Sequence, residues 1–210
     1  MNSPRTARLR SAAAALTACL AIVAPPAALA GAQPAAPTVV LVHGAFADPS
    51  SWAAVADQLA AQGIPVRTFD NPLRSVAGDA AALTAFLDGI DGPIVLVGHS
   101  YGGAVISNVH DPDVKANVFT PAVAADLYAH QRTAALQANL EPSGPPSWAH
   151  TPSWYLVSTR DRVIPPALQR MMADRAAPGR TGDVDASHVS PVSRPDRVTA
   201  VIRDAVAATS

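Results

Sequence analysis

Cysteine is nearly absent from this sequence of 210 residues, and its scarcity excludes several kinds of chemistry. The one cysteine, Cys19, lies in an apolar N-terminal stretch that we expect to be removed. The remaining chain would then have no disulfide, no thiol nucleophile and no cysteine-based metal site. The six histidines are scattered along the chain without a spacing typical of metal ligands. We therefore expect no metal site.

An excess of charge of one sign is lacking as well. The chain has 15 basic and 16 acidic residues, which gives a formal net charge of −1, and its basic residues form no cluster. Proteins that bind nucleic acids or anionic membrane surfaces usually do so through basic patches. We therefore expect neither of them as a partner.

A hydrophobic run long enough to span a membrane is also missing. Three arginines among the first ten residues precede an alanine- and leucine-rich run over residues 11–23, and the sequence Ala-Leu-Ala ends at Ala30. This order is typical of a secretory signal peptide, and its apolar run is too short to cross a membrane. It predicts a signal peptide over residues 1–30 and a secreted protein. An alternative stays open, because residues 16–19 resemble a lipoprotein processing site that would leave an acylated Cys19.

The rest of the chain alternates between two patterns. After an Ala/Pro linker over residues 31–37, apolar runs typical of buried strands alternate with helical spacing, which predicts a single α/β domain over residues 38–210 with a parallel sheet. The expected strands cover residues 38–43, 65–70, 94–97, 114–119, 154–159 and, more weakly, 181–185. The expected helices cover residues 51–62, 75–90, 101–109, 123–140, 166–176 and 195–208. Residues 141–152 are rich in turn formers and are expected to be irregular.

The stretch IVLVGHSYGGAVI, residues 94–106, contains the pattern G-x-S-x-G between an expected strand and an expected helix. In this context the pattern predicts a nucleophile elbow, a strained turn that exposes a serine hydroxyl. Glycines on either side of Ser100 keep neighbouring side chains from colliding. Ser100 is therefore the candidate nucleophile.

A serine hydroxyl is a weak nucleophile that needs a base, and the base needs an orienting acid. Asp161 and His188 follow the fifth and sixth expected strands, and the order Ser100, Asp161, His188 is the one that accompanies this elbow. Because the carboxyl ends of parallel strands lie at one edge of a sheet, we expect the three side chains to converge there. Asp185 is the alternative acid. His99 is expected to support the loop rather than to act as the base.

Backbone amides are expected to stabilise a developing oxyanion. One is the N–H of Tyr101, directly after the nucleophile, and the other comes from the loop after the first strand. In that loop Ala45 is the first choice and Phe46 the second. The side chains of Phe46, Trp52 and Tyr101 are candidates for apolar walls of an acyl pocket, or for core residues. Of these, we expect Phe46 to contact the substrate.

The segments VVLVHGAF, VLVGHSYGGAVI, STRDRVIPP and DASHVSPVSRPD resemble, in this order, those of the α/β-hydrolase superfamily. The resemblance covers nearly all of residues 38–208. It is nearest to bacterial relatives of plant methyl esterases, hydroxynitrile lyases and pyrethroid-type esterases. It implies an α/β-hydrolase fold, with a mostly parallel six-stranded sheet in the family order 4-3-5-6-7-8 and helices on both faces. It also implies a cofactor-free hydrolase in which Ser100 is the nucleophile, His188 the base and Asp161 its orienter.

Two departures narrow this resemblance. Gly44 and Val189 occupy positions where the lyases carry threonine and lysine, which disfavours lyase chemistry. The cap of the relatives is reduced here to a segment near residues 120–152, which should leave the site open and less desolvated. The sequence thus implies hydrolysis of small or medium carboxylic esters through an acyl-enzyme on Ser100. A ligand-binding protein without turnover and an amidase or peptidase remain alternatives.

Overall fold

The computed structural model describes residues 36–120, 133–135, 138 and 140–209. The predicted signal peptide and most of the predicted linker lie outside these residues. The same holds for most of the helix expected over residues 123–140 and for part of the expected cap. Among the described residues, no helix combines the length and the apolar character that crossing a membrane would require.

Six strands form one sheet in which every neighbouring pair is parallel. The order is β2-β1-β3-β4-β5-β6, which confirms the predicted order of strands. The strands are β1 (Thr38–Val42), β2 (Val66–Phe69), β3 (Ile94–His99), β4 (Val114–Thr120), β5 (Ser153–Ser158) and β6 (Thr181–Val184). Every residue of β3 and β5 is buried, as expected for central strands covered on both faces. The weakly predicted sixth strand does form, at the edge of the sheet, where it pairs with β5.

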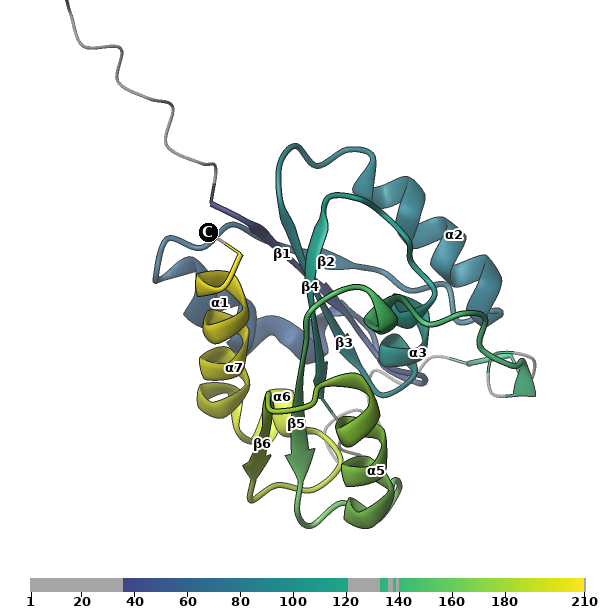
Figure 1. Cartoon of the computed structure of the whole chain (residues 1–210), viewed down its shortest axis with the longest axis vertical. Helices are drawn as coiled ribbons and strands as arrows, with labels where there is room; N and C mark the ends of the chain where they lie inside the picture. Colours follow the sequence, from purple (N-terminus) through teal and green to yellow (C-terminus); the bar gives the residue numbers. More distant parts are fainter. Residues whose placement is uncertain (1–35, 121–132, 136–137, 139, 210) are drawn as a thin grey trace, which may run out of the picture. The chain divides into compact units, whose positions relative to one another are not determined.

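Helices cover both faces of this sheet (Figure 1). They are α1 (Ala53–Ala60), α2 (Val76–Leu87), α3 (Tyr101–Ser107), α5 (Pro166–Ala176), α6 (Ser190–Ser193) and α7 (Pro195–Ala207), with 3₁₀ turns η1 (Pro49–Trp52) and η3 (Ser147–Ala149). The expected helix over residues 51–62 in fact begins as η1, because Pro49 starts the turn and the Asp48 side chain caps it. The turn η3 lies in the segment expected to be irregular, and α6 was not expected.

Alternation along the strands divides the core into two parts. Val40 and Val42 of β1 face a cluster that includes side chains of α2, α3 and α5, whereas Val39 and Leu41 face one that includes α1 and α7. Trp52 belongs to this second cluster and is 1% exposed. The expectation that it could line an acyl pocket is therefore wrong, and its alternative, a core residue, is right.

Candidate active site

Ser100 occupies the sharp turn between β3 and α3. Its backbone has φ 51° and ψ −120°, a conformation that costs a non-glycine residue about 1–3 kcal/mol. Two hydrogen bonds hold the turn: the Ser100 N–H donates to the Thr120 carbonyl at 3.0 Å, and the Gly103 N–H donates to the Ser100 carbonyl at 2.8 Å. The turn therefore has the strained backbone expected of a nucleophile elbow.

The glycines of the motif allow β1, β3 and α3 to approach one another closely. A Cβ on Gly98 would lie 2.7 Å from the Gly102 carbonyl oxygen, and a Cβ on Gly102 would lie 2.8 Å from the His43 carbonyl oxygen. Side-chain carbons do not come so close to backbone atoms. The glycines are thus required by packing, which agrees with the sequence-based interpretation of the motif.

The structure brings Ser100, His188 and Asp161 together at the carboxyl edge of the sheet. His188 Nε2 lies 3.2 Å from Ser100 Oγ, and His188 Nδ1 lies 2.6 Å from Asp161 Oδ2. An ionised carboxylate only accepts hydrogen bonds, so Nδ1 carries the proton and donates a hydrogen bond to Asp161. Nε2 is then free to accept the hydrogen bond from the serine hydroxyl. The arrangement selects the imidazole tautomer that can act as a base toward Ser100.

The Asp161 carboxylate is buried and receives four hydrogen bonds. Its Oδ1 accepts from the backbone N–H groups of Val163 at 2.7 Å and Ile164 at 2.9 Å. Its Oδ2 accepts from His188 and, at 2.7 Å, from the side-chain amide of Gln169. These donors hold the charged form of Asp161 in one orientation.

Gln169 was not identified from the sequence. It lies in α5, is fully buried, and its Oε1 also accepts the Ser158 N–H at 2.9 Å. The apolar pattern of α5 would not have revealed it, because Leu168 and Met171 are exposed whereas the buried positions are Gln169 and Ala173. A polar residue on the buried side of a helix must find partners, which here are the acid and the end of β5.

Asp185, the alternative acid, lies elsewhere. Its carboxylate is mostly exposed and pairs with Arg160. His188 is hydrogen-bonded to Asp161, so the geometry favours Asp161 over Asp185.

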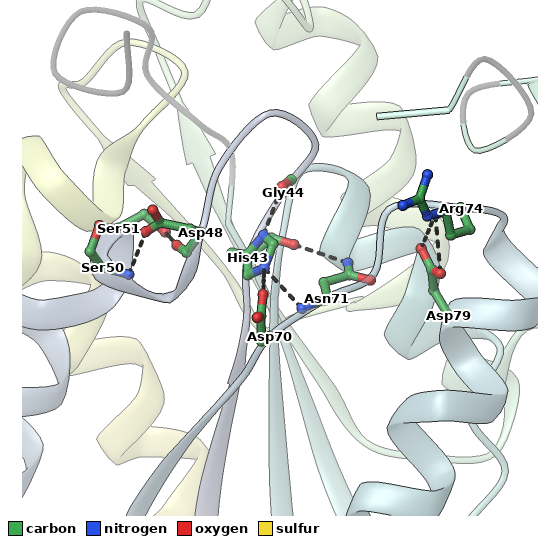
Figure 2. Close-up of polar contacts among 9 residues, drawn as sticks. All are labelled: His43, Gly44, Asp48, Ser50, Ser51, Asp70, Asn71, Arg74 and Asp79. Carbon is green, nitrogen blue, oxygen red and sulfur yellow. Dashed lines mark hydrogen bonds and ion pairs between the residues drawn. The ribbon is translucent and has the colours of Figure 1, made fainter. Parts of the chain in front are cut away.

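The loop after β1 lies directly against the nucleophile. A Cβ on Gly44 would be 3.1 Å from the Ser100 Cβ. Figure 2 shows how His43 holds this loop: Nε2 accepts the Asn71 N–H at 2.9 Å, so Nδ1 is the nitrogen that donates to the Gly44 carbonyl at 3.0 Å. Because the peptide group is planar and trans, the Ala45 N–H points away from His43. The sequence did not reveal that His43 and Asn71 hold this loop.

Phe46 follows in the same loop, with φ 63° and a side chain that is 47% exposed. It is not among the residues that line the cavity beside Ser100. The expectation that it contacts substrate stays a prediction.

Tyr101, which offers the other predicted amide, is fixed by its side chain. Its hydroxyl donates to Asp79 Oδ2 at 2.7 Å, and Asp79 also accepts the Arg74 N–H, a contact drawn in Figure 2. Burial, followed by the hydrogen bond to Asp79, raises the pKa of the Tyr101 phenol far above its ordinary value. The side chain packs in the core and anchors α3 to α2, so it is unsuited to proton transfer.

His99 is buried beside this site. Its ring packs edge-on against Trp52 with centroids 6.0 Å apart, and its centroid lies 6.1 Å from that of His188. Burial, and then the nearby His188 and His43, lower the pKa of His99 well below 6.5. His99 is therefore a neutral packing residue, in agreement with the expectation that it is not the base.

A cavity of about 480 Å³ opens beside Ser100. Such a volume is typical of sites for small molecules. Phe119 and Tyr155, whose rings stack with centroids 6.1 Å apart, line its wall at the sheet. Residues of α3, of α5 and of the segment 143–148 contribute the other sides.

Comparison with known proteins identifies the family. The model of the alpha/beta hydrolase family matches residues 39–125 and 111–201, and the chain belongs to this family. A search of curated proteins found no match. Similar solved structures include a pyrethroid hydrolase from Sphingobium faniae JZ-2, with 22% identity, a TM-score of 0.63, and coverage of 82% of this chain and 98% of that one. A methylesterase from Arabidopsis has 17% identity and a TM-score of 0.68, covering 81% and 99%. Polyneuridine aldehyde esterase has 16% identity and a TM-score of 0.67, covering 82% and 99%.

Proposed function

We propose that the protein is a secreted serine hydrolase that cleaves small or medium carboxylic esters. The observation that carries this proposal is the hydrogen-bonded series Ser100–His188–Asp161, in the tautomer that leaves Nε2 facing the hydroxyl, beside a cavity of small-molecule size. The names of the similar structures, which are esterases and a hydrolase of pyrethroids, support the choice of esters.

Each residue has a defined role in the proposed reaction. Ser100 Oγ attacks the ester carbonyl while His188 Nε2 takes its proton. The backbone N–H groups of Tyr101 and Ala45 stabilise the oxyanion of the tetrahedral intermediate. His188 then gives its proton to the departing alcohol, which leaves an acyl-enzyme on Ser100. A water molecule, deprotonated by His188, hydrolyses the acyl-enzyme and restores the serine.

Covalent labelling tests the nucleophile. The protein from Gly31 onward is treated with a fluorophosphonate and analysed by intact mass, with Ser100→Ala as the control. The proposal expects one adduct, absent from the variant. A folded parent protein without an adduct would contradict an activated serine, and a ligand-binding protein without turnover would then be the better interpretation.

Asp161→Asn tests the orienter. Its oxygen could keep the hydrogen bonds from Val163 and Ile164, but its amide would then face the donor nitrogens of Gln169 and His188. The imidazole would be driven toward the opposite tautomer, with Nε2 protonated. A comparable change in a serine protease lowers kcat by about 10⁴-fold, and we expect a loss of that order while the fold is retained.

A further inference from the structure

The cavity extends well beyond the reacting groups. Along α3 its lining follows Ser100, Gly103, Ala104 and Ser107, which lie on one side of the helix. From the helical rise, this row spans roughly 10 Å. The proposed reaction uses only the end at Ser100, so the rest of the cavity is available to hold one part of a substrate.

The part of the substrate that this cavity would hold is the acyl chain. The alcohol must leave on the side of His188, because His188 gives it a proton. His188 is not among the described residues that line the cavity, although Ser100 is. The cavity therefore extends from Ser100 away from the leaving group.

The lining of the cavity combines apolar side chains with one cation. The rings of Phe119 and Tyr155 and the side chain of Met172 form an apolar part of its lining. Arg175 is the one charged side chain among the described residues that line the cavity. It lies in the last turn of α5, whereas the first turn of this helix adjoins the loop that holds Asp161, so Arg175 lies at the end of α5 away from the reacting groups. A hydrocarbon chain would thus pass an apolar section before it reaches a cation.

Arg175 is held in place without an acidic partner among the described residues. Its guanidinium lies 5.7 Å from the centre of the Trp148 ring, a contact that orients it through the face of the indole. Arg160, Arg170 and Arg194, in contrast, each pair with an aspartate. A guanidinium that is held on an aromatic ring and has no acidic partner among the described residues matches a carboxylate.

We infer that the cavity selects esters whose acyl chain ends in a carboxylate, that is, monoesters of straight-chain dicarboxylic acids. The inference rests on the proposed function. The ester carbonyl lies at Ser100, the methylene chain along Phe119 and Tyr155, and the terminal carboxylate at Arg175. Hydrolysis consumes one water and releases the alcohol and the free dicarboxylate.

Kinetics with two p-nitrophenyl esters test the inference. The mono-p-nitrophenyl ester of suberic acid carries the terminal carboxylate, and p-nitrophenyl octanoate has a chain of the same length that ends in a methyl group. We expect the ratio of kcat/KM for the suberate ester to kcat/KM for the octanoate ester to fall about tenfold in Arg175→Gln. This loss is at the lower end of what a charge-assisted hydrogen bond contributes, because Arg175 is exposed. Arg180→Gln is the matched control, because Arg180 also lies over an indole, that of Trp154, but does not line the cavity. The control should keep the wild-type ratio.

Binding measurements separate this inference from the proposed function. Calorimetry follows suberate and octanoate binding to Ser100→Ala, with and without Arg175→Gln. Suberate binding that Arg175→Gln weakens, with octanoate binding little changed, supports the anion site even if neither ester is turned over. Turnover of both esters with a ratio that ignores Arg175 overturns the inference and leaves the esterase proposal intact. Absence of both turnover and suberate binding overturns both.

Discussion

Replacement of Gln169 by methionine is expected to lower kcat with little change in KM. Methionine has a similar size and flexibility but cannot replace the contacts to Asp161, Ser158 and the Ile164 carbonyl. A hydrogen bond to a charged group contributes about 1.5–3 kcal/mol. If that energy serves to hold Asp161 against His188, its loss lowers kcat by roughly 10- to 100-fold. KM should change little, because Gln169 does not line the cavity.

Stability should fall as well. The buried Ser158 N–H would lose its acceptor, which costs about 1–3 kcal/mol in the free energy of unfolding. Urea unfolding measures this loss, and active-site titration with a fluorophosphonate corrects kcat for any inactive fraction. Gln169→Glu is a second variant that retains an acceptor for Ser158 but turns an oxygen toward Asp161, so its kcat should fall at least as far.

Gln62→Met provides the matched control. The Gln62 amide donates to the Gln58 carbonyl at 2.8 Å on the exposed surface of the protein. Its loss should change stability by no more than about 0.5 kcal/mol and leave kcat unchanged. Folded Gln169→Met with wild-type kcat would refute the reasoning, because Asp161 would then be oriented without the amide.

Three further predictions concern the fold and the N-terminus. His99→Leu should reduce the loss of stability on acidification, because the pKa of His99 is lowered well below 6.5 in the folded state. Below about pH 6.5 the unfolded chain therefore takes up a proton that the folded protein does not, which lowers the free energy of unfolding by up to about 1.4 kcal/mol per pH unit. Urea unfolding at pH 7 and pH 5 checks this, and equal losses in parent and variant would contradict it. Gly102→Ala should destabilise the protein by about 1–3 kcal/mol, because the new Cβ would collide with the carbonyl oxygen of Val42 and lie 2.8 Å from that of His43. Gly89→Ala, where the nearest atom is 3.7 Å away, should be nearly neutral, and thermal unfolding compares the two variants. Intact mass of the exported protein should show a start at Gly31, and a lipid-modified Cys19 would contradict secretion.

Much of the architecture was predictable because its signals are local. A buried parallel strand produces a continuous apolar run, and the G-x-S-x-G elbow is contained within a single strand, turn and helix. The parallel sheet then fixes which loops share an edge, so the convergence of Ser100, Asp161 and His188 could be expected from their order alone. Even the weak sixth strand followed from the alternation, although its Gly182 and Asp183 are poor strand formers.

Other features depend on which side chains packing brings together, and only the tertiary structure decided them. Asp161 and Asp185 were both possible acids until the distance to His188 distinguished them. Trp52 could have lined a pocket or the core, and it packs in the core cluster on the face of the sheet opposite the cavity. Gln169 has a partner in Asp161 because the first turn of α5 places its side chain against the loop that precedes the helix. Sequence patterns specify which residues are buried and which turn is strained, whereas the identity of each polar partner depends on side-chain positions that packing alone determines.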